Sequence, residues 1–550
     1  MRVRGRFYKK IDSINFMLLL LSSTFRRISA FFKHTTFNYH FVIFLSSLYI
    51  IFAFNHTFFT TFNAQAVQVG FAYLVGLGWA IHTFIIALAL EILSLRISVK
   101  FVIGAVFLVC SVCGFYMDSM GVVIDEDIIQ SVFETHTNEA LEMIGFGLVG
   151  YVLGFGVLPC ALLSVIKLTK PPLIRAFRQK IIALVLLGAL VGASYVLYGK
   201  DITFVFKTQK SLSNMPNPIA PIRSLILYVQ HSKERHFTHT LIAQDAHLSY
   251  NAQPQIVLFV IGESARSANF SLNGYTRDTN AYTKYLDVIS FKEFYSCGVI
   301  TAISVPCMLT HYTRESYTHR NLSLYVNNIL DIAQSVGYDV WYLGNNGGKC
   351  VGGCDRNITH KILYPADSLD GAMLPDIERI IHDASRNKRP TFVVIHEYGS
   401  HGALYANRYP LAFEIFTPVC RQKELSKCTL EEITNAYDNS LVYGDYVLSQ
   451  MIESLQKANM RSMLWYVSDH GESLGELGQY MHGGLGYVLA PTHQKHIPSI
   501  MWFSPQWEQE PRTARANIEH EFSHDYVFHT LLHLLGIQTQ AYDSQLDILR

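Results

Sequence analysis

Residues 255–264 read QIVLFVIGES, an apolar run that ends in Gly262, Glu263 and Ser264. The run is rich in β-branched and aromatic side chains and is too short to cross a bilayer as a helix. Four similar runs follow it, at residues 339–344, 391–396, 463–468 and 496–503. None alternates cleanly between apolar and polar residues, which is typical of strands buried on both faces. The sequence therefore predicts an α/β domain over residues 254–550, with a mainly parallel central sheet covered by helices.

Reactive side chains follow several of these predicted strands. Glu263 follows the first run, HEYGSHG with His401 follows the third, and SDHGE with Asp469 and His470 follows the fourth. His482 comes shortly afterwards, in YMHGG. Chemistry in open α/β sheets collects beyond the carboxyl ends of the strands, so we expect these residues to converge on one edge. A single His or Asp at a strand end is more often structural than catalytic, but several together favour a functional site.

Glu263, Asp469 and His470 offer two carboxylates and an imidazole, a ligand set that suits Zn²⁺. A hydroxyl in the remaining position would lose its proton readily, because the cation stabilises the alkoxide. Thr301, in SCGVITAISVPCMLT (residues 296–310), is the first candidate for that position and hence for a nucleophile. A helix beginning near Thr301 would add a positive dipole end that suits the negative charge of a phosphate.

Two serines remain alternatives to Thr301. Ser304 lies about one helical turn further along the chain and would point to nearly the same side. Ser264 directly follows Glu263. His401 and His482 would then face the phosphoryl oxygens, the leaving group or a second zinc ion.

The first 200 residues have a different composition from the rest of the chain. Over the whole chain, half of the residues are hydrophobic and only 16% are charged, which is too apolar for an ordinary soluble enzyme. Five stretches have about the length of a membrane span, at residues 41–61, 70–94, 99–117, 144–166 and 181–199. The sequence predicts a basic cytoplasmic segment (1–40), an α-helical membrane domain of five transmembrane helices (41–200) and a connector (201–253). The net charge of +1 gives no general attraction to nucleic acid.

Charged residues orient the predicted spans. Basic residues gather before the first span, between the second and third, and between the fourth and fifth. The loop at residues 118–143 instead carries seven acidic residues and no Lys or Arg. The N-terminus is therefore predicted inside, and everything after residue 200 outside. We interpret INFMLLLLSS (residues 14–23) as a helix on the membrane surface rather than a cleaved signal.

Six of the nine cysteines follow residue 200 and form three close pairs, namely Cys297/Cys307, Cys350/Cys354 and Cys420/Cys428. An even count in close pairs favours disulfides in an oxidising compartment, with neighbours joined as the simplest pairing. A structural zinc cluster is the alternative, but only Cys350 and Cys354 have its short spacing. A Cys297–Cys307 bridge would hold the turn that carries Thr301.

Four motifs behind the predicted spans resemble those of the bacterial phosphoethanolamine transferases that modify lipid A and other lipopolysaccharide sites. They are GESARSANFSLNGYTRDTN, SCGVITAISVPC, HEYGSHG and SDHGESLGE, in this order. The resemblance covers nearly the whole chain and implies an outer domain of the alkaline phosphatase/sulfatase-like superfamily. It also implies a multi-pass protein of the bacterial inner membrane, with the catalytic domain in the periplasm. We expect a monomer.

The family resemblance also implies a reaction. Phosphatidylethanolamine would be the donor, and Thr301, activated by zinc, would take its phosphoethanolamine group and release diacylglycerol. The phosphothreonine would then pass the group to a phosphate or sugar hydroxyl, with a lipid A phosphate as the first candidate acceptor and polymyxin resistance as a consequence. Motif by motif, the zinc-site positions fall on Glu263, Thr301, Asp469 and His470. His401 and His482 fall on the pair that handles the phosphoethanolamine group or a second metal ion.

Three further residues have substrate-contact roles by the same resemblance. IIQSVFETHTNEA (residues 128–140) resembles the acidic outer loop that contacts the donor's ammonium, with Thr135 and Glu139 at matching positions. Ser131 stands where many members have asparagine. Lys349 is the candidate phosphate contact, although here it precedes Cys350, whereas the family commonly has a lysine between the two cysteines.

Three alternative functions fit the sequence less well. A phosphoglycerol transferase of the same superfamily would also have five spans and a metal–threonine site, but a glycerol headgroup has no cation to attract an acidic loop. A sulfatase needs an arginine after the proline of its nucleophile motif, where SVPCM has Met308. A non-enzymatic lipid sensor is disfavoured because the zinc-site residues are all present.

Overall fold

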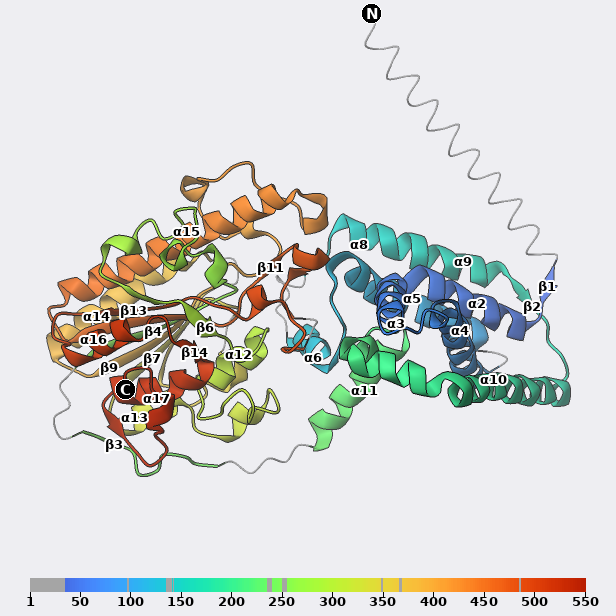
Figure 1. The fold of residues 1–550 in the computed structure, drawn as a ribbon, viewed down its shortest axis with the longest axis horizontal. Helices are drawn as coiled ribbons and strands as arrows, with labels where there is room; N and C mark the ends of the chain where they lie inside the picture. The colour runs from blue at the N-terminus through green and yellow to red at the C-terminus, as the bar shows by residue number, and fades with distance from the viewer. Residues whose placement is uncertain are drawn as a thin grey trace, which may run out of the picture. The chain divides into compact units, whose positions relative to one another are not determined.

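The structure is a computed structural model that describes residues 35–95, 98–134, 141, 143–234, 240–249, 255–347, 350–365, 368–483 and 486–550. Segment 14–23, Thr135, Glu139 and Lys349 lie outside the described residues. The chain forms two compact units (Figure 1). One comprises Met1–Ser119, Val123–Asp125 and Phe146–Leu225, and the other comprises Met120–Val122, Glu126–Gly145 and Ile226–Arg550.

The first unit is made of apolar helices. They are α2 (Tyr39–Phe54), α3 (His56–Gln68), α4 (Leu74–Leu93), α5 (Val99–Met120), α8 (Phe146–Tyr151) continuing through a π-helical turn (Val152–Val157) into α9 (Leu158–Val165), and α10 (Leu173–Thr208). Two short strands, β1 (Thr36–Phe37) and β2 (Lys167–Leu168), pair in parallel. Among the described residues, four helices are long and apolar enough to cross a membrane, or five if the bent pair α2 and α3 counts as one span.

The first predicted span is not one straight helix. It breaks at Asn55, and α2 and α3 meet there at 78°. The Asn55 side chain bonds to the backbone of Asn217 in both directions, donating to its carbonyl over 3.1 Å and accepting from its N–H over 2.8 Å. A polar side chain that satisfies backbone groups in this way is a common cause of a helix kink. The apolar count over residues 41–61 could not show this bend.

The second unit contains a seven-stranded sheet in the order β5-β13-β10-β4-β9-β7-β8. The strands are β4 (Ile256–Gly262), β5 (Ile289–Phe291), β7 (Asp339–Gly344), β8 (His360–Leu363), β9 (Thr391–His396), β10 (Ser462–Ser468) and β13 (Ser499–Phe503). The five from β10 to β8 are parallel, and β13 pairs antiparallel with both β10 and β5. The predicted mainly parallel α/β sheet is therefore confirmed, and the two short strands β5 and β8 are additions to it.

Helices cover both faces of this sheet (Figure 1). One face packs against α12 (Thr301–Met308), α13 (Ile329–Ser335) and α17 (Val527–Leu534), and the other against α14 (Leu374–Asn387) and α15 (Leu430–Lys457). Alternate residues of β4 enter the two cores, with Phe259 on the first face and Leu258 on the second, both fully buried. Burial on both faces explains why the strand runs lack a polar alternation.

The remaining α-helices and strands of this unit are not part of the central sheet. They are α6 (Glu126–Glu134), α11 (Ile219–Glu234, which begins in the helical unit), α16 (Gln509–Ala516) and the strand pairs β3 (His247–Leu248) with β15 (Ile537–Gln538), β6 (Glu293–Tyr295) with β14 (Glu521–Ser523), and β11 (Ser473–Leu474) with β12 (Tyr480–Met481). The acidic loop between the third and fourth predicted spans thus groups, over residues 126–145, with the α/β unit.

Candidate metal and nucleophile site

The central strands bring the predicted site residues to one edge of the sheet. β4 and β10 are parallel neighbours, with Gly262 opposite Ser468, so Glu263 and Asp469 leave the sheet side by side. β9 lies on the other side of β4 and ends at His396, which is opposite Ile261. Parallel strands in register therefore explain why residues more than 200 positions apart meet at this edge.

Glu263, Asp469 and His470 form one buried group whose ligand atoms all lie within 4.8 Å of one another. His470 Nε2 lies 3.4 Å from Glu263 Oε1 and 3.2 Å from Asp469 Oδ2. The other ring nitrogen, Nδ1, lies 2.9 Å from the Gly471 carbonyl oxygen and is therefore the N–H donor. The lone pair of Nε2 is left directed at the carboxylates, as metal ligation by an imidazole requires.

The electrostatics of this group fit a divalent cation. Burial, together with the nearby Asp469 carboxylate, raises the pKa of Glu263 well above its usual value. Asp469 Oδ2 is buried and has no hydrogen-bond partner in the part of the chain that the structure describes. His396 lies 3.6 Å from Glu263 Oε2, but burial lowers the pKa of His396 to about 4, so it supplies no balancing charge at neutral pH. Within the described ranges no Lys or Arg pairs with these two buried carboxylates, an arrangement that is typical of a metal site.

Thr301 lies against this group. It is the first residue of α12, so the expected helix start is present. Its Oγ1 lies 3.2 Å from Glu263 Oε2 and 3.2 Å from His470 Nε2. The side chain is half-buried, so the hydroxyl touches the ligand group and can still be approached from outside.

The two rival hydroxyls are placed differently. Ser304 is fully buried, and its Oγ accepts the Gly298 N–H over 3.0 Å. Ser264 is also fully buried and donates to Glu263 Oε1 over 2.8 Å. Thr301 is therefore the hydroxyl, of these three, that combines contact with the ligand group and exposure.

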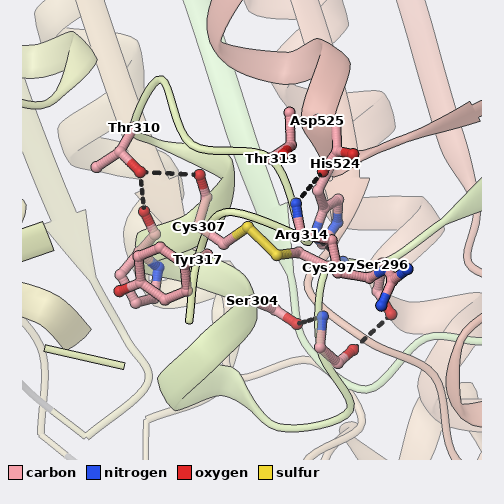
Figure 2. The surroundings of a disulfide bond; sticks show 12 residues. Ser296, Cys297, Ser304, Cys307, Thr310, Thr313, Arg314, Tyr317, His524 and Asp525 are labelled. Carbon is pink, nitrogen blue, oxygen red and sulfur yellow. Dashed lines mark hydrogen bonds between the residues drawn. A yellow bond between two sulfur atoms is a disulfide. The ribbon is translucent and has the colours of Figure 1, made fainter. Parts of the chain in front are cut away.

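The Cys297–Cys307 disulfide supports the turn before Thr301 (Figure 2). The backbone N–H of Cys297 donates to His524 Nδ1 over 3.0 Å, and His524 Nε2 lies 2.9 Å from the Ser468 carbonyl oxygen. Burial lowers the pKa of His524 to about 4, which keeps the ring in the neutral form that can accept at one nitrogen and donate at the other. His524 thus connects the disulfide segment to the end of β10, directly before Asp469.

The other two predicted pairs are also disulfides. Cys350 bonds to Cys354 and Cys420 bonds to Cys428, so all three neighbour pairings are confirmed. Cys110, Cys113 and Cys160, in the helical unit, form no disulfide with one another.

Replacement of the first disulfide is expected to affect both stability and turnover. The double variant Cys297→Ala/Cys307→Ala should lose about 2–4 kcal/mol of unfolding free energy, because the bridge restricts the conformations of the unfolded chain. Activity should fall by about tenfold or more, because the Thr301 turn loses its anchor. A thermal melt and a turnover assay on the detergent-solubilised protein measure the two effects, with Cys110→Ala/Cys160→Ala as the control for cysteine removal. Unchanged melting and turnover would count against this supporting role.

His401 and His482 lie beside the buried group of Glu263, Asp469 and His470. The rings of His470 and His482 have centroids 4.0 Å apart, and those of His401 and His482 are 5.8 Å apart. His482 Nδ1 lies 3.0 Å from Glu472 Oε2, which fixes Nδ1 as the protonated nitrogen. Burial, reinforced by the nearby His482 and Arg408, lowers the pKa of His401 well below its usual value. Among the described residues, no group of three metal-ligating side chains includes His401 or His482, so a second metal site gains no support from this arrangement.

Four supporting residues, two of which stand at predicted strand ends, have no role that the sequence assigns. They are Asn346, which donates to Glu263 Oε2 over 2.5 Å, together with His396, Glu472 and His524. His396 and Glu472 lie within the quoted motifs HEYGSHG and SDHGE, but no spacing rule distinguishes a supporting side chain from a ligand. His524 is distant in sequence from every motif and had no signal at all.

The comparisons with known proteins support the family resemblance. Residues 255–537 match the sulfatase family, and residues 82–233 match the family "Phosphoethanolamine transferase EptA/EptB". Phosphoethanolamine transferase EptA of Escherichia coli K12 is 34% identical over 469 residues, which cover 80% of this chain and 84% of that protein. Phosphatidylethanolamine transferase Mcr-1 of Escherichia coli is 30% identical, covering 83% and 87%.

A solved structure extends the likeness to the whole fold. The integral membrane lipooligosaccharide phosphoethanolamine transferase A of Neisseria meningitidis superposes with a TM-score of 0.86 at 26% identity, covering 94% of this chain and 99% of that one. The periplasmic domain of EptC from Campylobacter jejuni, at 38% identity, matches with a TM-score of 0.52 over 57% of this chain and 98% of its own. Because relatives of 30% identity or more match at least 80% of this chain, the chain belongs to the phosphoethanolamine transferase family.

Proposed function

We propose that this protein transfers phosphoethanolamine from phosphatidylethanolamine to a lipopolysaccharide acceptor, first of all a lipid A phosphate, through a phosphothreonine intermediate at Thr301. It would act in the bacterial inner membrane, with the α/β unit in the periplasm, as a zinc-dependent enzyme. The observation that carries the proposal is the half-buried Thr301 hydroxyl, held 3.2 Å from both Glu263 Oε2 and His470 Nε2 at the start of a helix.

The reaction has two displacements at phosphorus. A Zn²⁺ ion held by Glu263, Asp469 and His470 would lower the pKa of the Thr301 hydroxyl and offset the charge of its alkoxide. Thr301 Oγ1 attacks the phosphorus of the donor, and the bond to the glycerol oxygen breaks, so that diacylglycerol leaves after taking up a proton. An oxygen of the acceptor then attacks the same phosphorus, and the Thr301 oxygen leaves as the hydroxyl re-forms.

His401 and His482 are the residues that we assign to the phosphoethanolamine group and the leaving oxygen. Glu472 holds the His482 ring in one tautomer, which pre-organises it as carboxylate–histidine pairs do elsewhere. The low pKa of His401 keeps it neutral at pH 7, so it offers one N–H donor and one acceptor there. Neither residue needs a second metal ion for this role.

The donor is tested by a direct comparison of headgroups. Purified full-length protein should release diacylglycerol from phosphatidylethanolamine in the presence of lipid A, and much more slowly from phosphatidylglycerol of the same acyl chains. The reverse preference would support the phosphoglycerol transferase alternative and contradict the proposal. Two relatives from Escherichia coli K12 bear on the acceptor: Kdo(2)-lipid A phosphoethanolamine 7''-transferase is 25% identical to this chain, and phosphoethanolamine transferase EptA is 34% identical.

Expression in a susceptible Gram-negative host is expected to raise polymyxin resistance. An added phosphoethanolamine brings an ammonium group to a lipid A phosphate, which weakens the attraction of the cell surface for a cationic peptide. The inhibitory concentration should rise several-fold, and mass spectrometry of the extracted lipid A should show the added group on a phosphate. Modification of the Kdo sugar without any lipid A phosphate adduct would contradict the acceptor assignment.

Glu139→Ala is expected to weaken use of the donor, because we assign this carboxylate to the donor's ammonium. A single carboxylate–ammonium ion pair typically contributes about 1 kcal/mol, so the KM for phosphatidylethanolamine should rise by roughly fivefold. The zinc content of the purified protein should stay at the wild-type level. A loss of zinc, or an unchanged KM, would be inconsistent with the assignment.

A further inference from the structure

Asp370 is a buried carboxylate that joins the loops following two strands of the central sheet. It begins the short helical turn Asp370–Met373 that leads into α14, and only 3% of the residue is exposed. Its Oδ1 accepts the Tyr398 N–H and the Asn345 side-chain amide, each over 2.7 Å, and its Oδ2 accepts the Gly399 N–H over 2.9 Å. Three donors that converge on two oxygens favour the ionised form of the group. The carboxylate therefore holds the loop after β7 and the loop after β9 together.

The loop after β7 touches the side chain of Glu263. Asn345, whose amide Asp370 accepts, is followed directly by Asn346. Asn346 Nδ2 donates to Glu263 Oε2 over 2.5 Å. The Asn345 N–H donates to the His396 carbonyl oxygen over 2.9 Å, which fixes this loop against the end of β9. The position of Asn345 therefore sets where the Asn346 amide meets the carboxylate of the proposed metal ligand.

The loop after β9 touches the main chain of Glu263. The Ser400 N–H donates to the Glu263 carbonyl oxygen over 3.0 Å. Gly399 has a positive φ of 51°, and a Cβ atom added to it would lie 2.6 Å from the same oxygen. Asp370 accepts the N–H groups of the two residues directly before Ser400, and His401 follows directly after it. Because the fit is this close, a shift of the loop would move both Glu263 and His401.

Asp370 acts on Glu263 only through these two loops. In the part of the chain that the structure describes, it forms no direct hydrogen bond with Glu263. Groups that orient a metal ligand from outside typically change metal affinity or activity by about 10–100-fold when they are replaced. A misplacement of about 1 Å is enough to slow a reaction by about 100-fold. A carboxylate that sets the path of both loops can therefore control how well the site is formed.

We propose that Asp370 is a positioning residue that fixes the metal ligand Glu263 from two sides. The loop after β7 acts on the carboxylate of Glu263, and the loop after β9 acts on its main chain. The same β9 loop places His401, which directly follows it in the chain. The inference rests on the proposed function, in which Glu263 holds zinc and His401 faces the phosphoethanolamine group.

The test compares Asp370→Asn with the wild type in full-length protein. The amide has the volume of the carboxylate but keeps at most two of its three hydrogen bonds, because its NH2 group then faces an N–H donor. Zinc affinity, measured by competition with a chelator, should fall by about tenfold, and kcat at saturating zinc should fall by about tenfold or more. The KM for phosphatidylethanolamine should change less than kcat, because the two loops hold reacting groups.

Asp445→Asn is the matched control for loss of a buried carboxylate. Asp445 lies on α15, is 2% exposed, and accepts the N–H groups of Tyr282 over 2.8 Å and Thr283 over 3.1 Å and the amide of Asn280 over 3.1 Å. These partners lie in neither of the loops that Asp370 joins. Asp445→Asn should lower the melting temperature about as much as Asp370→Asn does, with zinc affinity and kcat at the wild-type values. An equal loss of zinc affinity in both variants shows a purely structural role and overturns the inference, as does wild-type zinc affinity in Asp370→Asn.

Gly399→Ala reaches Glu263 without any change to Asp370. The added Cβ atom would meet the Glu263 carbonyl oxygen, so zinc affinity should fall here too. Gly337→Ala is the control for backbone strain, because Gly337 also has a positive φ, of 100°, but its added Cβ would have nothing within 4 Å. This control should keep the zinc affinity of the wild type. Wild-type zinc affinity in Gly399→Ala contradicts the proposed path through the β9 loop.

Glu263→Gln separates this inference from the function on which it rests. The variant should lose most of its zinc affinity, because an amide is a poor metal ligand. If Glu263→Gln binds zinc as the wild type does, the proposed function fails and the inference fails with it. If Glu263→Gln loses zinc while Asp370→Asn and Gly399→Ala keep it, the positioning role alone fails.

Discussion

Thr301→Ala should lower transfer of phosphoethanolamine by about a thousandfold or more, because the variant loses the atom that forms the covalent bond. Metal binding should be largely kept, since Glu263, Asp469 and His470 are untouched. The variant should also keep its melting temperature, because the Thr301 side chain is half-buried and its hydroxyl contacts only the ligand group among the described residues. Diacylglycerol release from phosphatidylethanolamine measures the first effect, and elemental analysis measures the second.

Two control variants separate the nucleophile from the helix that carries it. Thr301→Ser keeps a hydroxyl at the same place and should retain part of the activity. Thr310→Val removes a buried hydroxyl that bonds to the Pro306 carbonyl oxygen at the other end of the same segment, and should affect stability more than turnover. Wild-type transfer by Thr301→Ala would show that the nucleophile is a different group.

Asp469→Asn has the second-largest expected effect. The amide is a poor metal ligand, so zinc content should fall and transfer should drop by about a thousandfold. Asp469 Oδ1 accepts the N–H groups of Ser264 over 3.1 Å and His470 over 2.7 Å, and an amide oxygen can accept both. The fold around the strand end should therefore survive the substitution.

Asp469→Asn should also differ from the wild type in how its melting temperature responds to a chelator. Burial and the Asp469 charge both raise the pKa of Glu263, so the wild-type site without metal holds two carboxylates that disfavour each other. Chelation should lower the wild-type melting temperature, because bound metal stabilises the folded state. Asp469→Asn should melt at or above the temperature of the chelated wild type and should respond little to chelator. An equal response of both proteins to chelator would argue against a metal at this site, and Asp287→Asn on the surface is the control.

The sheet could be predicted because its strands are buried on both faces. Runs such as those of β4 and β10 contain almost only apolar residues, and each is followed directly by a reactive side chain. Because parallel strands bring their carboxyl ends together, Glu263 and Asp469 could be placed in one site before any contact was known. β5 and β8, with three and four residues, were too short to give such a pattern.

The contacts that support the site could not be predicted from the sequence. His524 bonds to Cys297 across 227 positions, and Asn346 bonds to Glu263 across 83. Such contacts depend on the folded path of the chain and leave no local spacing. The kink at Asn55 is similar, since its cause is the distant Asn217. Charge alone predicted that the acidic loop lies outside, but Arg320 and Lys423 of the α/β unit bind main-chain oxygens of that loop, which no composition reveals.

The most direct test of the central claim is intact mass spectrometry of the full-length protein after incubation with phosphatidylethanolamine and no acceptor. A phosphothreonine intermediate predicts a mass gain of one phosphoethanolamine, mapped to Thr301 in the tryptic peptides and absent after chelation or in Thr301→Ala. Addition of lipid A should then remove the adduct and modify the lipid. An adduct on Ser304, on Ser264 or on a histidine, or turnover to product without any adduct at Thr301, would contradict the account.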